Sequence, residues 1–144
     1  MRFIAGEQDG EADERLERVT DYIRSTLHEA PDYQKLARLA NLSYCQLFRL
    51  FKRHLNLSPQ HYIEHQRIEY AKRLLGLNHL SIKEIAAQLG FDNPLYFSRR
   101  FQKATGLSPS HYRINRLADP EKALHPYSYY MGTTITDRTY GSFA

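Results

Sequence analysis

The 144-residue chain contains one cysteine, Cys45, and it lacks long apolar runs. A single thiol excludes an internal disulfide and a zinc site built from several cysteines, and it fits a reducing compartment. Because no run of 18 apolar residues is present, the sequence predicts no membrane-spanning helix. The first 18 residues mix acidic residues with arginine and have no apolar core, so we expect no secretory signal peptide.

Motifs of catalysis are also missing. The sequence has no glycine-rich phosphate loop, no nucleophile elbow and no paired catalytic carboxylates, so we expect neither an enzyme nor a bound cofactor. His61 and His65 could share a metal ion, but no acidic or cysteine ligand is placed beside them. We therefore expect a solvated helix face there and no metal site. Cys45 could sense oxidants, but it lacks a resolving thiol.

Acidic residues are scarce in the middle of the chain. Residues 33–116 hold 14 Lys and Arg against 4 Asp and Glu, whereas residues 1–32 hold 4 against 9. Residues 117–144 are nearly balanced, with 2 against 3. The net charge of +4 therefore conceals a strongly cationic central block. Such a block indicates a polyanionic partner, and a merely solvated basic surface is the alternative.

Apolar residues recur at helical spacing through most of the chain, and no segment before residue 125 alternates convincingly with the period of a strand. The sequence therefore predicts an all-α fold of seven helices. Their starts are expected from capping residues and from prolines at the first helical position, and their ends from glycine or proline. The expected start signals are Asp13, Asp32, Ser43, Ser58-Pro59, Ser81 with Glu84, Asn93-Pro94 and Ser108-Pro109, and the expected stop signals include Pro31, Gly76 and Gly90.

A large part of this pattern occurs twice. Leu-Ser-Pro-Gln-His-Tyr at 57–62 returns as Leu-Ser-Pro-Ser-His-Tyr at 107–112. Upstream positions match at an offset of 50 or 49, with one extra residue in the second turn. The matching pairs are Phe51 and Phe101, Leu47 and Phe97, Arg49 and Arg99, Leu36-Ala37 and Ile85-Ala86, and Leu42 and Phe91. The sequence thus predicts a duplicated unit of short helix, tight turn, second helix and a helix started by Ser-Pro.

Each unit has the features of a helix-turn-helix. A small residue, Ala37 or Ala86, lets the first helix approach the second closely across the turn. On a helical wheel, Arg49 and Arg99 each lie at the centre of the polar face of the second helix. The guanidinium fork matches the two acceptors of guanine in the major groove. A solvated helix side is the alternative for one such face, but its recurrence favours DNA reading.

Residues 89–113, Leu-Gly-Phe-Asp-Asn-Pro-Leu-Tyr-Phe-Ser-Arg-Arg-Phe-Gln-Lys-Ala-Thr-Gly-Leu-Ser-Pro-Ser-His-Tyr-Arg, resemble the signature of the AraC/XylS family of bacterial transcription regulators. Residues 36–63 resemble the first helix-turn-helix of that family, and the likeness extends over about residues 14–116. The resemblance implies two helix-turn-helix subdomains joined by a long helix. That helix, at about 18 residues, would be roughly 27 Å long, which is comparable with the groove repeat of about 34 Å once helix diameters are added.

The resemblance also implies a division of the chain and a set of site residues. The expected segments are an acidic N-terminal segment (1–13), a first subdomain (14–57), a linker helix (58–76), a second subdomain (77–116) and a C-terminal tail or the start of a further module (117–144). The expected base-reading residues are Cys45, Phe48, Arg49, Asn93, Leu95, Ser98 and Arg99. The expected phosphate-binding residues are Gln46, Lys52, Arg53, Tyr96, Gln102 and Lys103.

The short chain is similar to the small, stand-alone MarA-, SoxS- and Rob-like members of the family. This likeness implies a bacterial, cytoplasmic and nucleoid-associated activator that binds double-stranded DNA as a monomer and recruits RNA polymerase. A helical adaptor whose basic face meets an acidic protein is the second hypothesis, and the DNA-binding part of a longer regulator is a further reading. Binding of single-stranded RNA is a weaker alternative, because the exposed aromatic platforms that it uses are missing.

Overall fold

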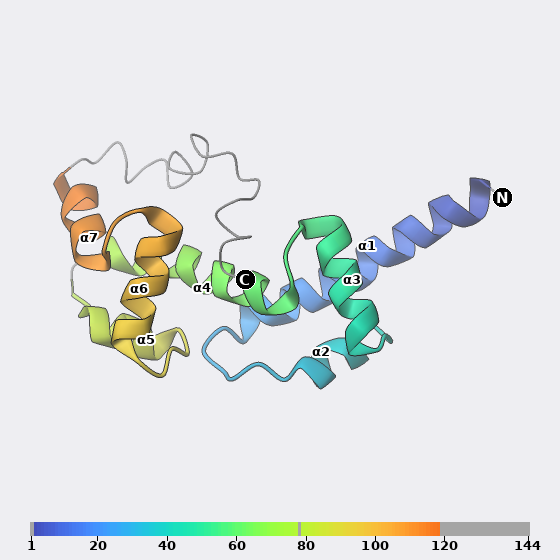
Figure 1. Cartoon of the computed structure of the whole chain (residues 1–144), viewed down its shortest axis with the longest axis horizontal. Helices are drawn as coiled ribbons and strands as arrows, with labels where there is room; N and C mark the ends of the chain where they lie inside the picture. The colour runs from blue at the N-terminus through green and yellow to red at the C-terminus, as the bar shows by residue number, and fades with distance from the viewer. Residues whose placement is uncertain (1, 78, 119–144) are drawn as a thin grey trace. The chain divides into compact units, whose positions relative to one another are not determined.

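The computed structural model describes residues 2–77 and 79–118. Within these ranges it contains seven α-helices and no strand, which confirms the all-α prediction (Figure 1). No helix in the described ranges is long and apolar enough to cross a membrane. Residues 119–144, which include most of the predicted tail or further module, lie outside the description. The helices are α1 (Arg2–Ser25), α2 (Tyr33–Leu39), α3 (Tyr44–Leu55), α4 (Pro59–Leu75), α5 (Ile82–Gln88), α6 (Pro94–Thr105) and α7 (Pro109–Ala118).

The helices form two compact units, with the division falling inside α4 after Ile63. In the first unit, α1 packs against α2 and α3, and α2 packs against α3. Its core buries apolar side chains from all three helices, from the segment that leads into α4 and from the first turns of α4. These residues are Leu16, Val19, Ile23, Leu36, Ala37, Ala40, Leu47, Phe51, Leu57, Tyr62 and Ile63.

Helix α1 differs from the prediction at both ends. It begins at Arg2, so the expected start after a cap at Asp13 is wrong. The acidic segment contains no proline, and its two glycines, Gly6 and Gly10, weaken a helix without breaking it. The helix ends at Ser25, well before Pro31. A turn follows, in which the N–H of Thr26 donates a hydrogen bond to the carbonyl of Ile23 at 3.1 Å.

The second unit begins at Glu64 and comprises the rest of α4 with α5, α6 and α7. Here α5 packs against α6, and α6 packs against α7. The core lies among these helices and α4. Its buried members are Ile68, Ala71, Leu74, Leu75, Ile85, Ala86, Leu89, Phe91, Phe97, Phe101 and Tyr112.

The two predicted turns have the same backbone construction. In the first, the N–H of Leu42 donates to the carbonyl of Ala37 at 3.0 Å, and in the second the N–H of Phe91 donates to the carbonyl of Ala86, also at 3.0 Å. The residue before each donor, Asn41 or Gly90, has a positive φ. Ala37 and Ala86 are buried, as expected for residues that let two helices approach closely. The internal repeat is therefore confirmed in three dimensions.

The repeat continues in the connections from α3 to α4 and from α6 to α7. Asn56 and Gly106 both adopt left-handed backbone, at φ 57° and 83°. Ser58 and Ser108 each accept a bond from the backbone N–H three residues later, at 3.2 Å in both units. The tyrosine of each repeated string then packs edge-on against the last buried phenylalanine of the second helix. The ring centroids are 5.5 Å apart for Phe51 and Tyr62, and 5.3 Å for Phe101 and Tyr112.

The long helix buries charged and polar groups that the sequence placed in solvent. His61 and His65 are both half-buried, so the expected solvated face is wrong. Burial lowers the pKa of His65 to about 4, with a neighbouring Lys72 acting in the same direction and Glu69 opposing it. Lys72 is 2% exposed and donates to Glu69 at 3.1 Å, and its burial lowers its pKa to about 8. In the described part of the chain, no group of three or more potential metal ligands occurs.

Replacing Gly106 tests the left-handed position at the end of α6. A Cβ atom at Gly106 would meet nothing within 4 Å, so any cost of Gly106→Ala comes from its φ alone. We expect Gly106→Ala to lower the free energy of unfolding by about 1 kcal/mol in urea denaturation. Gly106→Asn, which copies Asn56 of the first unit, should cost less, because asparagine tolerates this conformation. Equal stability of all three proteins would contradict the account.

The burial of His65 predicts a stability that depends on pH. The unfolded chain binds a proton at His65 below about pH 6.5, but the folded chain binds it only near pH 4. Stability contributed at neutral pH is therefore lost as the pH falls from about 6.5 to 4, by about 2 kcal/mol between pH 7.5 and 5. Urea denaturation should show a shallower dependence in His65→Gln. An unchanged pH profile in that variant would be inconsistent with a buried neutral histidine.

Candidate nucleic-acid interface

Helix α3 is rotated so that its cationic side faces solvent. Leu47 and Phe51, one turn apart, are fully buried and fix this rotation. The helix begins with the predicted cap: the Oγ of Ser43 accepts from the N–H of Gln46 at 3.2 Å, and the Gln46 side chain accepts from the N–H of Ser43 at 2.9 Å. Gln46 thus closes a capping box, which leaves its amide NH2 as the group suited to a phosphate.

The predicted residues of α3 lie together on this exposed side. Arg49, Lys52 and Arg53 are exposed, and none forms an ion pair within the described ranges. Phe48 is 37% exposed, and the Nζ of Lys52 lies 5.9 Å from its ring centroid. Cys45 is a free, exposed cysteine in the first turn. Such a face offers cationic donors and an apolar ring, without competing carboxylate partners.

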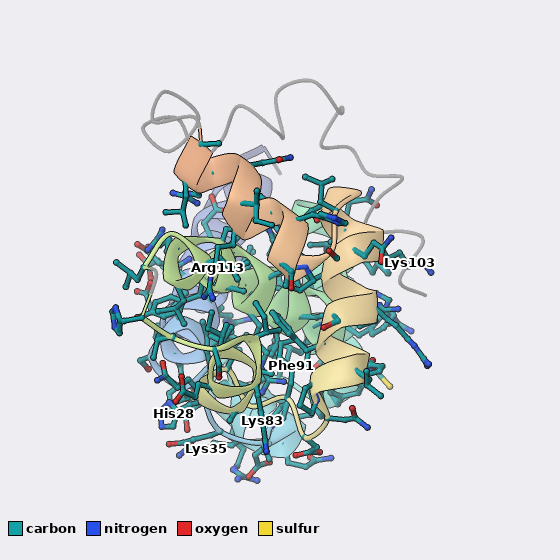
Figure 2. All side chains as sticks on the ribbon, turned by 90° about the vertical axis from the view of Figure 1, so that its left-hand side faces the viewer. His28, Lys35, Lys83, Phe91, Lys103 and Arg113 are labelled. Atoms are coloured by element: carbon teal, nitrogen blue, oxygen red, sulfur yellow. The ribbon has the colours of Figure 1, made fainter. Side chains whose placement is uncertain are left out.

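Helix α6 has the equivalent rotation in the second unit. Phe97 and Phe101 are fully buried, while Arg99, Gln102 and Lys103 are exposed. Lys103 projects from the end of α6 away from the helix (Figure 2). None of the exposed basic residues of α6 forms an ion pair with another described residue.

The first turn of α6 is apolar and already capped. Leu95 is 68% exposed and Tyr96 is 52% exposed, with the Tyr96 ring tilted against Phe91 at 6.3 Å. The side-chain oxygen of Asn93 accepts from the N–H groups of Leu95 (2.8 Å) and Tyr96 (3.4 Å). Pro94 has no N–H. This helix end is therefore occupied by its own cap and presents side chains outward.

This cap bears on the predicted role of Asn93. Two-point recognition of adenine uses both the oxygen and the nitrogen of the amide. Because the oxygen of Asn93 is engaged in the cap, such a contact would break cap bonds, whereas a contact through its nitrogen alone would not. Ser98 is half-buried, so it is less accessible than Arg99, the next residue on the helix.

Adjacent arginines on α6 have different surroundings. Arg100 is half-buried and forms a two-point ion pair with Glu64, in which its Nη2 donates to Oε2 at 3.0 Å. In contrast, Arg99 is exposed. Nothing in the sequence indicated this pair, because Glu64 is 36 residues away from Arg100. Only three-dimensional packing distinguishes a structural arginine from one available to a ligand.

Two arginines of α7 also have structural roles that sequence reasoning missed. Arg113 donates to the carbonyls of Leu75 (3.2 Å) and Leu80, and Figure 2 shows Arg113 on the side of α7 that approaches this segment. Arg116 donates to the carbonyl of Lys72 at 2.8 Å. The carbonyls of Lys72 and Leu75 lie at the end of α4, where cationic side chains are favoured, and that of Leu80 lies between α4 and α5. Part of the cationic excess thus stabilises the fold.

The contrast between Arg99 and Arg100 can be measured on the free protein. Arg100→Ala leaves the half-buried Glu64 carboxylate without its partner and should lower the free energy of unfolding by about 2 kcal/mol. Arg99→Ala, the matched control, removes the same charge from solvent and should change stability by less than about 0.5 kcal/mol. Urea denaturation checks both values. Equal losses for the two variants would show that the assigned surroundings are wrong.

Comparisons with known proteins match this arrangement. A family model described as a helix-turn-helix domain matches residues 36–115. The arabinose operon regulatory protein of Escherichia coli is 38% identical over 102 residues, which cover 70% of this chain and 35% of that protein. The lactose operon transcription activator of Staphylococcus xylosus is 31% identical over 100 residues, covering 69% and 36%. The chain spans about a third of the length of these curated relatives.

Solved structures agree with the sequence relatives. The DNA-binding domain of AdpA, a global transcriptional factor, was solved in complex with a target DNA. Its sequence is 31% identical to this chain and its TM-score is 0.67, and the match covers 74% of this chain and 96% of that one. The C-terminal domain of AraT, a response regulator from Geobacillus stearothermophilus, is 35% identical with a TM-score of 0.66, covering 71% and 85%. The chain therefore belongs to the AraC-type family of helix-turn-helix DNA-binding transcription regulators.

Proposed function

We propose that the chain binds specific double-stranded DNA by placing α3 and α6 in adjacent major grooves of one duplex. The observation that supports this most directly is the pair of equivalent arginines, Arg49 and Arg99. Each is exposed on the second helix of a helix-turn-helix and has no ion-pair partner among the described residues. In this proposal, residues 58–76, which include α4, connect a first subdomain at 14–57 to a second at 77–116. Residues 2–13 of the acidic segment belong to α1.

The proposed contacts follow the chemistry of the exposed side chains. Arg49 and Arg99 donate to guanine edges, and Phe48 makes an apolar contact in the groove. Cys45, Asn93, Leu95 and Ser98 complete the proposed base-reading set. Phosphates, which give affinity without sequence information, are bound by long polar and basic groups beside the arginines. These are Gln46, Lys52, Arg53, Tyr96, Gln102 and Lys103.

We further propose that the regulator acts in bacteria as an activator that recruits RNA polymerase and binds its site as a monomer at the nucleoid. The Staphylococcus xylosus relative is named as a transcription activator, which supports this direction. The duplicated unit supports a monomer, because one chain already supplies two second helices. A monomer of this kind requires a site with two unlike half-sites about ten base pairs apart.

Selection of bound duplexes from a random pool tests the proposal. Enrichment of two half-sites about one helical turn apart, without palindromic symmetry, is the expected result. Palindromic sites would instead indicate a symmetric dimer. If the protein retains no duplex even at low salt, the adaptor hypothesis, in which the basic face meets an acidic protein, replaces DNA binding.

Arginine and lysine variants should separate base reading from phosphate binding. Arg49→Ala or Arg99→Ala should each cost about 1–3 kcal/mol of binding free energy at the selected site and relax the preference at one position. Lys52→Ala or Arg53→Ala should weaken all duplexes alike and lower the slope of log affinity against log salt by about one. Arg73→Ala, which removes an exposed charge from α4, is the control. Equal losses of the arginine variants on random DNA would contradict base reading.

A further inference from the structure

The first turn of α6 presents an exposed leucine on a cationic face. At 68%, Leu95 has the largest exposed fraction of the large apolar side chains in residues 10–77 and 79–118. Arg99 lies four residues later, one turn along the same face, and is also exposed. The cap of Asn93 has already satisfied the N–H groups of Leu95 and Tyr96. A ligand at this end of α6 would therefore contact the side chain of Leu95, because the N–H groups of Leu95 and Tyr96 are already bonded to Asn93.

Leucine has no hydrogen-bonding group, so it gains free energy only by burying its surface against another apolar group. In the major groove of B-DNA, the apolar group at the base edges is the C5-methyl of thymine. Facing a cytosine amino group or a purine acceptor, Leu95 would remove water from a polar atom and offer no bond in return. The chemistry of the exposed turn therefore selects thymine.

We propose that Leu95 determines specificity by packing on a thymine methyl, at a fixed spacing from the guanine bound by Arg99. Four residues of α-helix rise about 6 Å, and base pairs are about 3.4 Å apart along the duplex, so the thymine lies about two steps from the guanine when α6 runs along the groove. This inference rests on the proposed function, since it requires α6 to occupy a major groove.

The first unit lacks this arrangement, and it provides an internal control. The position of the repeat equivalent to Leu95 holds Cys45, which is smaller. The large exposed apolar side chain of α3 is Phe48, which directly precedes Arg49 instead of lying a turn before it. The two second helices thus present their apolar and guanidinium groups in different orders, and the half-site of α6 has its own thymine requirement.

Replacing thymine by uracil removes only the methyl group and tests the contact directly. Starting from a duplex selected from the random pool, each thymine is replaced singly by deoxyuridine, and affinities are measured for wild type, Leu95→Ala and Phe48→Ala. Burial of one methyl group is worth about 0.8 kcal/mol, which is about a fourfold change in Kd. Wild type should lose about fourfold at one thymine, located about two steps from the guanine whose preference Arg99→Ala relaxes.

The variants decide the assignment. Leu95→Ala should bind thymine and uracil equally at that position, while Phe48→Ala should keep the fourfold difference there. Alanine is the best helix former, so Leu95→Ala should remain folded, which circular dichroism verifies. If Leu95→Ala keeps wild-type discrimination, or if no thymine of this half-site is sensitive, the leucine contacts something other than DNA bases and the inference is wrong. Failure to select any duplex would overturn the proposed function itself.

Discussion

The structure depends on the burial of two apolar side chains, one turn apart, on the second helix of each unit. Leu47 with Phe51, and Phe97 with Phe101, are all fully buried. Burial at these two positions fixes the rotation of the helix about its axis. The residue two positions after the first member of each pair is then turned about 200° away from it, toward solvent. That residue is Arg49 in one unit and Arg99 in the other, so core packing determines which side chains can reach a ligand.

The cationic excess of the chain is divided between two roles. Arg100, Arg113 and Arg116 are half-buried and pair with Glu64 or with backbone carbonyls, and Lys72 pairs with Glu69 inside the second unit. The exposed arginines and lysines of α3 and α6 have no ion-pair partner among the described residues. Only this second group has donors that are not already bonded to the fold and so can reach phosphates and base edges. Net charge alone therefore overstates the polyanion-binding surface, and it is the position of each charge that indicates DNA.

The sequence was sufficient to predict the features that depend on local interactions. The caps at Ser43, Ser81 and Asn93, the prolines that begin α4, α6 and α7, and the inward faces of α3 and α6 were all predicted correctly, because each involves residues within one or two helical turns. Features that depend on distant residues were not predicted. The pairing of Arg100 with Glu64 and the burial of His65 follow from packing between separate segments. The early start of α1 was missed because a cap at Asp13 is a permissible start signal and no proline precedes it to prevent a longer helix.

In the proposed complex, Arg49 and Arg99 each contact a guanine, one in each of two neighbouring grooves. Replacing single guanines by 7-deazaguanine removes one of the two acceptors that an arginine fork uses while leaving base pairing intact. Affinity measured across a selected site should fall at two guanines about one helical turn apart, and each variant, Arg49→Ala or Arg99→Ala, should lose the sensitivity at one of them only. Sensitivity at no guanine, or sensitivity that survives in both variants, would show that these arginines do not bind guanine.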